Sequence, residues 1–116
     1  PNNLPNWLSN EDLEFFTKEF KKSGMFGPLN RYRCMDLDWK DLFNLSFNKI
    51  KKPSCFITGS LDPVNFFIPG VNLFDSIDKN YDDLRVKEQL NDIGHWTQQE
   101  APEQVNKILL DFLEKI

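Results

Sequence analysis

An acidic side chain and the single histidine of the chain each follow a segment that we expect to form a strand. Asp62 stands in GSLDPV after the apolar run SCFITG, and His95 opens HWTQQE after a more polar run. Residues that follow neighbouring parallel strands emerge at the same edge of a sheet, where α/β proteins place their sites. A carboxylate there can hold an imidazole in one tautomer and stabilise its protonated form, leaving the other ring nitrogen as a general base.

Residue type and spacing also allow a purely structural interpretation of this pair. An aspartate before a proline is a common turn residue, and a histidine after a glycine can cap a helix or donate to a carbonyl. Glu100 is expected to accept from a nearby backbone amide or to cap a helix. Ser60 lies outside a G-x-S-x-G elbow and is therefore a poor nucleophile candidate. A catalytic interpretation needs further motifs.

The apolar periodicity predicts helices on either side of two strands. Ser9 and Asp12 form a capping box for a helix over residues 9–22, which Gly24 follows. A second helix is expected from Pro28, with Trp39 and Phe43 continuing its apolar face. Next we expect a strand at 54–59, a loop at Asp62 and a short helix at about 69–77. A second strand is expected through Leu84, Val86 and Leu90, ending at Gly94 and His95. A closing helix is predicted from the apolar stripe Val105, Ile108, Leu109, Phe112 and Ile116.

The order strand, helix, strand, helix predicts an α/β fold with a parallel pair of strands. Parallel strands are normally buried within a larger sheet, and two strands alone are marginally stable. We therefore expect residues before Pro1, or another chain, to complete the sheet. The sequence begins without an initiator methionine, which suggests a trimmed, processed or partly observed polypeptide.

Composition argues against several classes of protein. With 14 basic and 18 acidic residues, the chain has a net charge of −4 and lacks the basic stripe that nucleic-acid binding requires. It contains no targeting segment and no apolar run long enough to span a membrane. One histidine with the scattered Cys34 and Cys55 does not suggest a metal site, and we expect no cofactor. A free, buried Cys55 favours a reduced, cytoplasmic setting.

Three separated motifs resemble the soluble epoxide hydrolase family of the α/β hydrolases. GHWTQQEAPEQVNKILLDFL is similar to the last loop and helix of that family, GSLDPV to its acid-bearing loop, and FKKSGMFGPLNRYR to the end of its lid domain. By these matches His95 corresponds to the catalytic base, Asp62 to its orienting acid and Tyr32 to a lid tyrosine. The resemblance implies the end of a helical lid in residues 1–48 and the C-terminal part of the α/β-hydrolase core in residues 49–116.

The resemblance also implies a mechanism. In this family an aspartate attacks an epoxide carbon while two tyrosines donate to the ring oxygen, and the histidine then activates water to hydrolyse the resulting ester to a diol. The substrates implied are a small apolar epoxide and water. The nucleophile, the oxyanion-hole turn and the second tyrosine have no counterpart among these motifs, so we expect the 116-residue chain alone to be inactive.

Some residues depart from the family pattern or have less certain roles. Arg31 stands where the family commonly has tryptophan, and the FFIPG sequence after Asp62 is unusual. Phe66 and Phe67 are candidates to line the substrate tunnel, although packing against the lid is the alternative. Trp96 is a candidate substrate contact, with packing against the sheet or shielding of His95 as alternatives.

Other functions remain open at this point. A haloalkane dehalogenase or another α/β hydrolase would share the fold, although Tyr32 in GPLNRYR argues against the dehalogenase. A non-catalytic fragment or interaction module would explain the missing nucleophile. Lid contacts could also support a homodimer.

Overall fold

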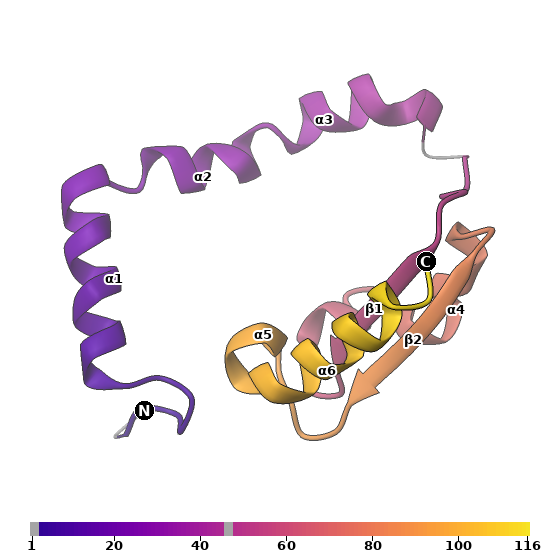
Figure 1. The fold of residues 1–116 in the computed structure, drawn as a ribbon. Coiled ribbons are helices and arrows are strands. Elements are labelled where there is room, and N and C mark those ends of the chain that lie inside the picture. Colours follow the sequence, from indigo (N-terminus) through magenta and orange to yellow (C-terminus); the bar gives the residue numbers. More distant parts are fainter. Residues whose placement is uncertain (1–2, 46–47) are drawn as a thin grey trace. The chain divides into compact units, whose positions relative to one another are not determined.

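The computed structural model describes residues 3–45 and 48–116, and the chain divides into two compact units, residues 1–48 and 49–116 (Figure 1). The described part of the first unit contains only helices. The second unit contains a parallel pair of strands with helices around it. No helix in the described ranges has the length and apolar character needed to cross a membrane.

The first helix, α1 (Asn10–Ser23), begins at the predicted capping box. The Ser9 hydroxyl accepts a hydrogen bond from the Asp12 amide at 3.1 Å, and the Asp12 carboxylate accepts one from the Ser9 amide at 3.0 Å. The Ser9 hydroxyl also donates to the Asp12 carboxylate at 2.6 Å, and this bond, together with the one from the Ser9 amide, lowers the pKa of the Asp12 carboxyl. Gly24 ends the helix with φ 71°, a conformation that favours glycine, while its amide donates to the Phe20 carbonyl. The predicted helix is confirmed, with bounds shifted by one residue.

The single helix predicted from Pro28 is wrong, because the chain forms two helices there. These are α2 (Phe26–Arg33) and α3 (Met35–Leu42), followed by the 3₁₀ turn η1 (Phe43–Leu45). Pro28 still lies in the first turn of α2, where its missing N–H leaves no hydrogen bond unmade. Cys34 separates the helices with φ −88° and ψ 0°: its amide closes α2, and its carbonyl accepts the first hydrogen bonds of α3.

The sheet of the second unit consists of β1 (Ser54–Gly59) and β2 (Leu84–Leu90). The strands are parallel, with Cα partners running from Ser54 and Leu84 to Gly59 and Leu90, which confirms the predicted pairing. The connection between them contains η2 (Pro63–Phe66), α4 (Leu73–Ser76) and η3 (Ile77–Asn80). Both strands therefore end at the same edge of the sheet, and the loops that carry Asp62 and His95 begin there (Figure 1).

Two predicted boundaries in this connection and after β2 are wrong. The helix expected at about 69–77 is one α-turn followed by a 3₁₀ turn, because the Asn72 side chain accepts from the Phe74 amide and starts it late. β2 ends at Leu90 rather than at Gly94. Asp92 turns the chain with φ 59°, and its amide donates to the Ser60 hydroxyl at 2.9 Å.

The closing segment forms α5 (Thr97–Glu100) and α6 (Pro102–Leu113), and α6 packs against β1. The core contains Leu90, Ala101 and Val105, with Ile57, Ile93 and Ile108 against them. Phe112 is also buried. The predicted stripe is therefore correct for Val105, Ile108 and Phe112. It is wrong for Leu109, which is 39% exposed, and for Ile116, which lies beyond the helix end and is 62% exposed.

The burial predicted for the first strand holds only at its end. Thr58 and Gly59 are buried, whereas the four preceding residues are half-buried. Cys55 is a free thiol, as predicted, but it is half-buried rather than buried. Partial burial, with a contribution from the charge of Glu88, raises the pKa of this thiol.

Candidate active site

The Asp62 carboxylate is held in a turn directly after β1. Asp62 is 8% exposed, and its Oδ1 accepts from the Val64 amide at 2.9 Å. Its own amide donates to the Gly59 carbonyl at 3.2 Å, while its carbonyl accepts from the Asn65 amide at 3.1 Å. This turn leads into η2, with Pro63 at the first position. The carboxylate is therefore fixed by local backbone bonds before it meets any other side chain.

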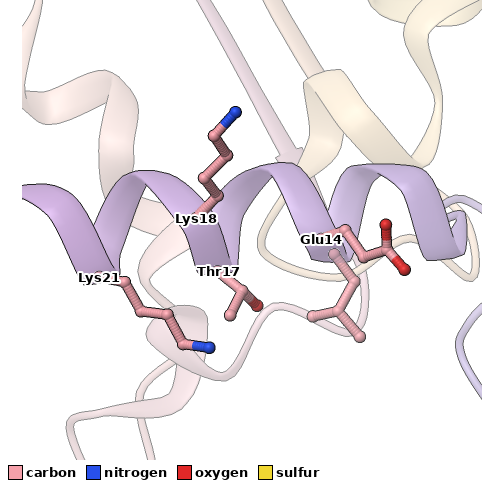
Figure 2. A pocket seen from close by; sticks show the side chains of 5 residues that line it. Glu14, Thr17, Lys18 and Lys21 are labelled. Carbon is pink, nitrogen blue, oxygen red and sulfur yellow. The ribbon is translucent and has the colours of Figure 1, made fainter.

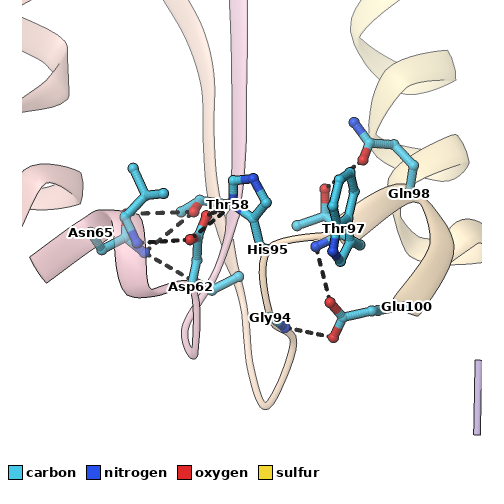
Figure 3. A network of polar contacts seen from close by, with 11 residues as sticks. Thr58, Asp62, Asn65, Gly94, His95, Thr97, Gln98 and Glu100 are labelled. Carbon is cyan, nitrogen blue, oxygen red and sulfur yellow. Dashed lines mark hydrogen bonds and ion pairs between the residues drawn. The ribbon is translucent and has the colours of Figure 1, made fainter. Parts of the chain in front are cut away.

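His95 meets this carboxylate through one ring nitrogen. Its Nδ1 lies 3.0 Å from Oδ1 and 3.1 Å from Oδ2 of Asp62 (Figure 3). An ionised carboxylate can only accept hydrogen bonds, so Nδ1 carries the proton and Nε2 keeps a lone pair. The Asp62 side chain is 11% exposed and that of His95 is 51% exposed. The carboxylate of the pair is therefore shielded from solvent, whereas the imidazole is exposed enough for its Nε2 to accept a proton from a bound molecule.

The loop that carries His95 is bound to a second carboxylate. Glu100 Oε2 accepts from the Gly94 amide at 2.7 Å, and Oε1 accepts from the Trp96 amide at 3.0 Å. The prediction that Glu100 bonds a backbone amide is confirmed. The Trp96 ring meets the His95 ring edge-on, with centroids 5.3 Å apart, but Trp96 is 55% exposed. Trp96 is therefore not a core residue of this chain.

Gly59 allows the two loops to approach each other closely. A Cβ added there would lie 2.1 Å from the Ile93 carbonyl oxygen, closer than atoms can pack. The Leu61 amide donates to that same oxygen at 2.9 Å, and the Ser60 amide donates to the Leu90 carbonyl at 2.9 Å. The absence of a side chain at Gly59 thus lets the two loops share hydrogen bonds, which brings Asp62 and His95 together.

A pocket of about 480 Å³ lies beside this pair. Its volume is within the range of small-molecule sites. Its lining includes Asp62, His95 and Trp96 together with apolar side chains, namely Phe56, Ile57, Val64, Leu73 and Ile77. In residues 3–45 and 48–116, no three histidine, cysteine or acidic side chains are placed to hold a metal ion. The arrangement suits proton transfer next to an apolar ligand.

Comparison with known proteins shows the family to which this chain belongs. No protein-family model matches the chain. Epoxide hydrolase B from Mycobacterium tuberculosis is 38% identical over 113 residues, which cover 97% of this chain and 31% of that protein. Epoxide hydrolase 1 from Siraitia grosvenorii is 34% identical over 118 residues, covering 99% of this chain and 37% of that protein. The crystal structure of epoxide hydrolase A from Mycobacterium thermoresistibile aligns with a TM-score of 0.84 at 36% identity, over 98% of this chain and 34% of that one.

The chain is homologous to the C-terminal part of the epoxide hydrolases. It spans about a third of the length of these relatives. A crystal structure of an epoxide hydrolase from Vigna radiata aligns over all of this chain with a TM-score of 0.88 at 32% identity. The predicted fold class is confirmed: these residues form a partial α/β-hydrolase fold, with two parallel strands and flanking helices.

The structure describes the other candidate residues within their own units. Tyr32 belongs to the first unit, where it lies on α2 and is 72% exposed. The neighbouring Arg31, at the position where tryptophan is common, forms an ion pair with Asp38 of α3 at 2.7 Å. Phe66 and Phe67 are 57% and 70% exposed, and neither lines the pocket beside His95.

The first unit has a hollow of its own along α1 (Figure 2). Its volume is about 460 Å³, and it is lined by Leu13, Glu14, Thr17, Lys18 and Lys21. Only Lys21 of these residues belongs to one of the three motifs that resemble the epoxide hydrolases. The hollow lies on one face of a single helix, so it is a surface depression rather than a candidate active site.

Asn65 supports the site and was missed by sequence reasoning. It is 3% exposed, and its Nδ2 donates to the Gly59 carbonyl at 3.0 Å and to the Thr58 hydroxyl at 3.3 Å (Figure 3). These bonds join the end of β1 to the turn that holds Asp62. The only available sequence signal was the position of Asn65 one helical turn after Asp62.

Replacing Asn65 with alanine should therefore destabilise the protein. The substitution leaves the buried Thr58 hydroxyl without the Asn65 amide and removes one of the bonds to the Gly59 carbonyl, which still accepts from the Asp62 amide; we expect a cost of about 1–3 kcal/mol. The free energy of unfolding in urea measures this loss. Asn106→Ala, at an exposed position of α6, is the matched control and should change it by less than about 0.5 kcal/mol. Equal effects of the two substitutions would contradict the role given to Asn65.

Proposed function

We propose that the protein containing this chain is an epoxide hydrolase that opens an epoxide to a vicinal diol through a covalent aspartyl ester. The observation that carries this proposal is the contact between Asp62 and His95 at the rim of an apolar pocket. Its support is the homology of the whole chain to proteins named epoxide hydrolases. The substrate is a small apolar epoxide, the second substrate is water, and no cofactor takes part.

The first chemical step forms the ester. An aspartate outside this chain attacks an epoxide carbon, the carbon–oxygen bond of the ring breaks, and the ring oxygen receives a proton from a tyrosine. Tyr32 is one donor and the second tyrosine also lies outside this chain. A phenol suits this role because its hydroxyl is protonated at neutral pH and can therefore donate to the developing alkoxide.

The second step hydrolyses the ester and uses the pair in this chain. His95 Nε2 takes a proton from water, and the resulting hydroxide attacks the ester carbonyl. The bond between the acyl carbon and the alkyl oxygen breaks, the alkoxide takes the proton back from the imidazolium, and the diol leaves. The carboxylic acid left on the nucleophile returns its proton to the tyrosinate formed in the first step, which restores the starting state. Asp62 stabilises the imidazolium and holds Nδ1 protonated.

The two units have different parts in this proposal. Residues 1–48 are the end of the helical lid, which supplies Tyr32, and residues 49–116 are the end of the hydrolase core, which supplies Asp62 and His95. The free cysteines Cys34 and Cys55 fit a reducing, cytoplasmic location.

The direct test is diol formation from a simple apolar epoxide such as styrene oxide. The complete protein should produce the diol, whereas the 116-residue chain alone should produce none, because the nucleophile lies outside it. Turnover by this chain alone would contradict that placement. No turnover by the complete, folded protein with any of a panel of apolar epoxides would contradict the proposed activity.

Tyr32→Phe should slow ester formation in the complete protein by about 10²-fold, the usual cost of removing one donor to a developing oxyanion. Single-turnover measurement of epoxide loss reports this step. Tyr81→Phe is the matched control. Tyr81 is the other tyrosine of these 116 residues, and it belongs to the second unit, where it forms a parallel bridge with Ile50. Equal rates for Tyr32→Phe and Tyr81→Phe would remove Tyr32 from the mechanism.

A further inference from the structure

We infer that Glu100 is a positioning residue for His95, an inference that rests on the proposed epoxide hydrolase function. The carboxylate binds the main chain on both sides of the histidine. Oε2 accepts from the Gly94 amide and Oε1 accepts from the Trp96 amide, at 2.7 and 3.0 Å (Figure 3). Each oxygen serves one amide, so both are needed to hold the three-residue segment.

The segment from Gly94 to Trp96 depends on these bonds because it lies between β2 and α5, where neither the Gly94 nor the Trp96 amide has a ladder or helical partner in the described part of the chain. Glu100 lies directly against its backbone: a Cβ added to Gly94 would be 2.9 and 3.1 Å from the two carboxylate oxygens. Charge-assisted hydrogen bonds to backbone amides are shorter and stronger than neutral ones. The carboxylate therefore sets the path of the main chain through His95.

Glu100 is itself anchored to the core. Its amide donates to the Trp96 carbonyl at 2.8 Å, which closes the turn of α5. Thr97 at the start of α5 and Ala101 just after Glu100 are both buried, at 6% exposure each. Because Glu100 is fixed between buried residues, its carboxylate holds the irregular segment around His95 in place relative to the core.

Fixing the loop matters because the His95 ring has few supports. Its side chain is 51% exposed, its Nδ1 is bound to Asp62, and Trp96 lies edge-on beside it. A general base must stay within hydrogen-bonding distance of the water that it activates. A shift of the main chain at His95 would move Nε2 away from that water. In the proposed mechanism only ester hydrolysis uses His95 as the base, so ester formation should be spared.

Glu100→Gln in the complete protein tests this inference. Glutamine has the same size but offers one acceptor oxygen and one NH₂ donor, so one of the two amides loses its acceptor. We expect ester hydrolysis to slow by at least about tenfold, the scale on which small misplacements reduce rates, with ester formation unchanged. Stopped-flow kinetics with styrene oxide and intact-protein mass spectrometry separate the two steps. Glu103→Gln, which removes an exposed charge three residues away, is the matched control and should behave as wild type.

The possible outcomes separate this inference from the proposed function. If wild type forms no diol and His95→Ala forms no adduct, the proposed function fails. The proposed function stands if wild type turns over and His95→Ala accumulates ester. In that case, wild-type ester hydrolysis by Glu100→Gln, or equal slowing of ester formation and ester hydrolysis in that variant, would overturn only the role of Glu100. Should Glu100→Gln not fold, Glu100→Asp, whose shorter side chain cannot span both amides, takes its place. Failure of both variants to fold would show that Glu100 supports the fold rather than the base, and would also overturn the inference.

Discussion

His95→Ala should lower steady-state diol formation by the complete protein by about 10²–10⁴-fold, the usual contribution of a general base. In the proposed mechanism the pair of Asp62 and His95 activates water, so the loss should fall on ester hydrolysis and leave ester formation intact. Multiple-turnover diol production and single-turnover epoxide loss, measured on the same preparation, report the two steps. Equal slowing of both steps would contradict the assignment of His95 to hydrolysis.

The same substitution should have little effect on stability. The His95 side chain is about half exposed, and its ring contacts are the Asp62 carboxylate and the edge of Trp96. Removing an exposed ring leaves no cavity in a packed core, so the free energy of unfolding should change by less than about 1 kcal/mol. Thermal unfolding of His95→Ala beside wild type checks that lost activity is not lost folding.

Asp62→Asn should be the second most damaging substitution, with a loss of diol formation of up to about 10⁴-fold. The neutral amide no longer stabilises the imidazolium that forms when His95 takes a proton. Its NH₂ group can also donate to Nδ1, which places the ring proton on Nε2 and removes the base. The rate of ester hydrolysis, measured in a single turnover, is the relevant quantity.

The structure offers a matched control for that experiment. An asparagine at position 62 can still accept from the Val64 amide, so the turn after β1 should persist and unfolding should be little changed. Asp92→Asn removes an exposed carboxylate from the loop before His95, at φ 59°, a conformation that asparagine tolerates. Asp92→Asn should keep wild-type kinetics. If it impaired hydrolysis as much as Asp62→Asn, general electrostatics rather than the contact with His95 would explain both results.

The pairing of the two parallel strands and the contact between Asp62 and His95 could be predicted, because they follow from residue patterns and from the topology of parallel sheets. Strand-forming residues between turn residues mark β1, and parallel strands with a crossover end at one edge of the sheet. The bonds made by Glu100 were predicted for a similar reason: an acidic side chain near the start of a helix usually finds nearby amides. The capping box at Ser9 and Asp12 is equally local.

Features decided by single backbone conformations or by long-range contacts could not be predicted. The break at Cys34 comes from its dihedral angles, at a residue type that carries no helix-ending signal. The late start of α4 depends on which of several polar residues becomes the cap, and Asn72 does. Asn65 is buried because β1 and η2 pack together, which its neighbours in sequence do not reveal.

Exposure of apolar side chains was also beyond sequence reasoning. Phe66, Phe67 and Trp96 are each more than half exposed, although their types favour burial. A chain that spans about a third of its relatives contains only part of the packing surface that such residues meet in a whole hydrolase. The role of these three side chains as substrate contacts stays a prediction.

In the proposed reaction, His95 and Asp62 hydrolyse an ester formed on an aspartate outside residues 1–116. Mass spectrometry of the complete His95→Ala protein after incubation with styrene oxide tests it most directly. We expect a mass increase of one epoxide per protein, located by peptide mapping on an aspartate outside these residues. Absence of the adduct in a folded protein that still binds the epoxide, or an adduct within residues 1–116, would contradict it.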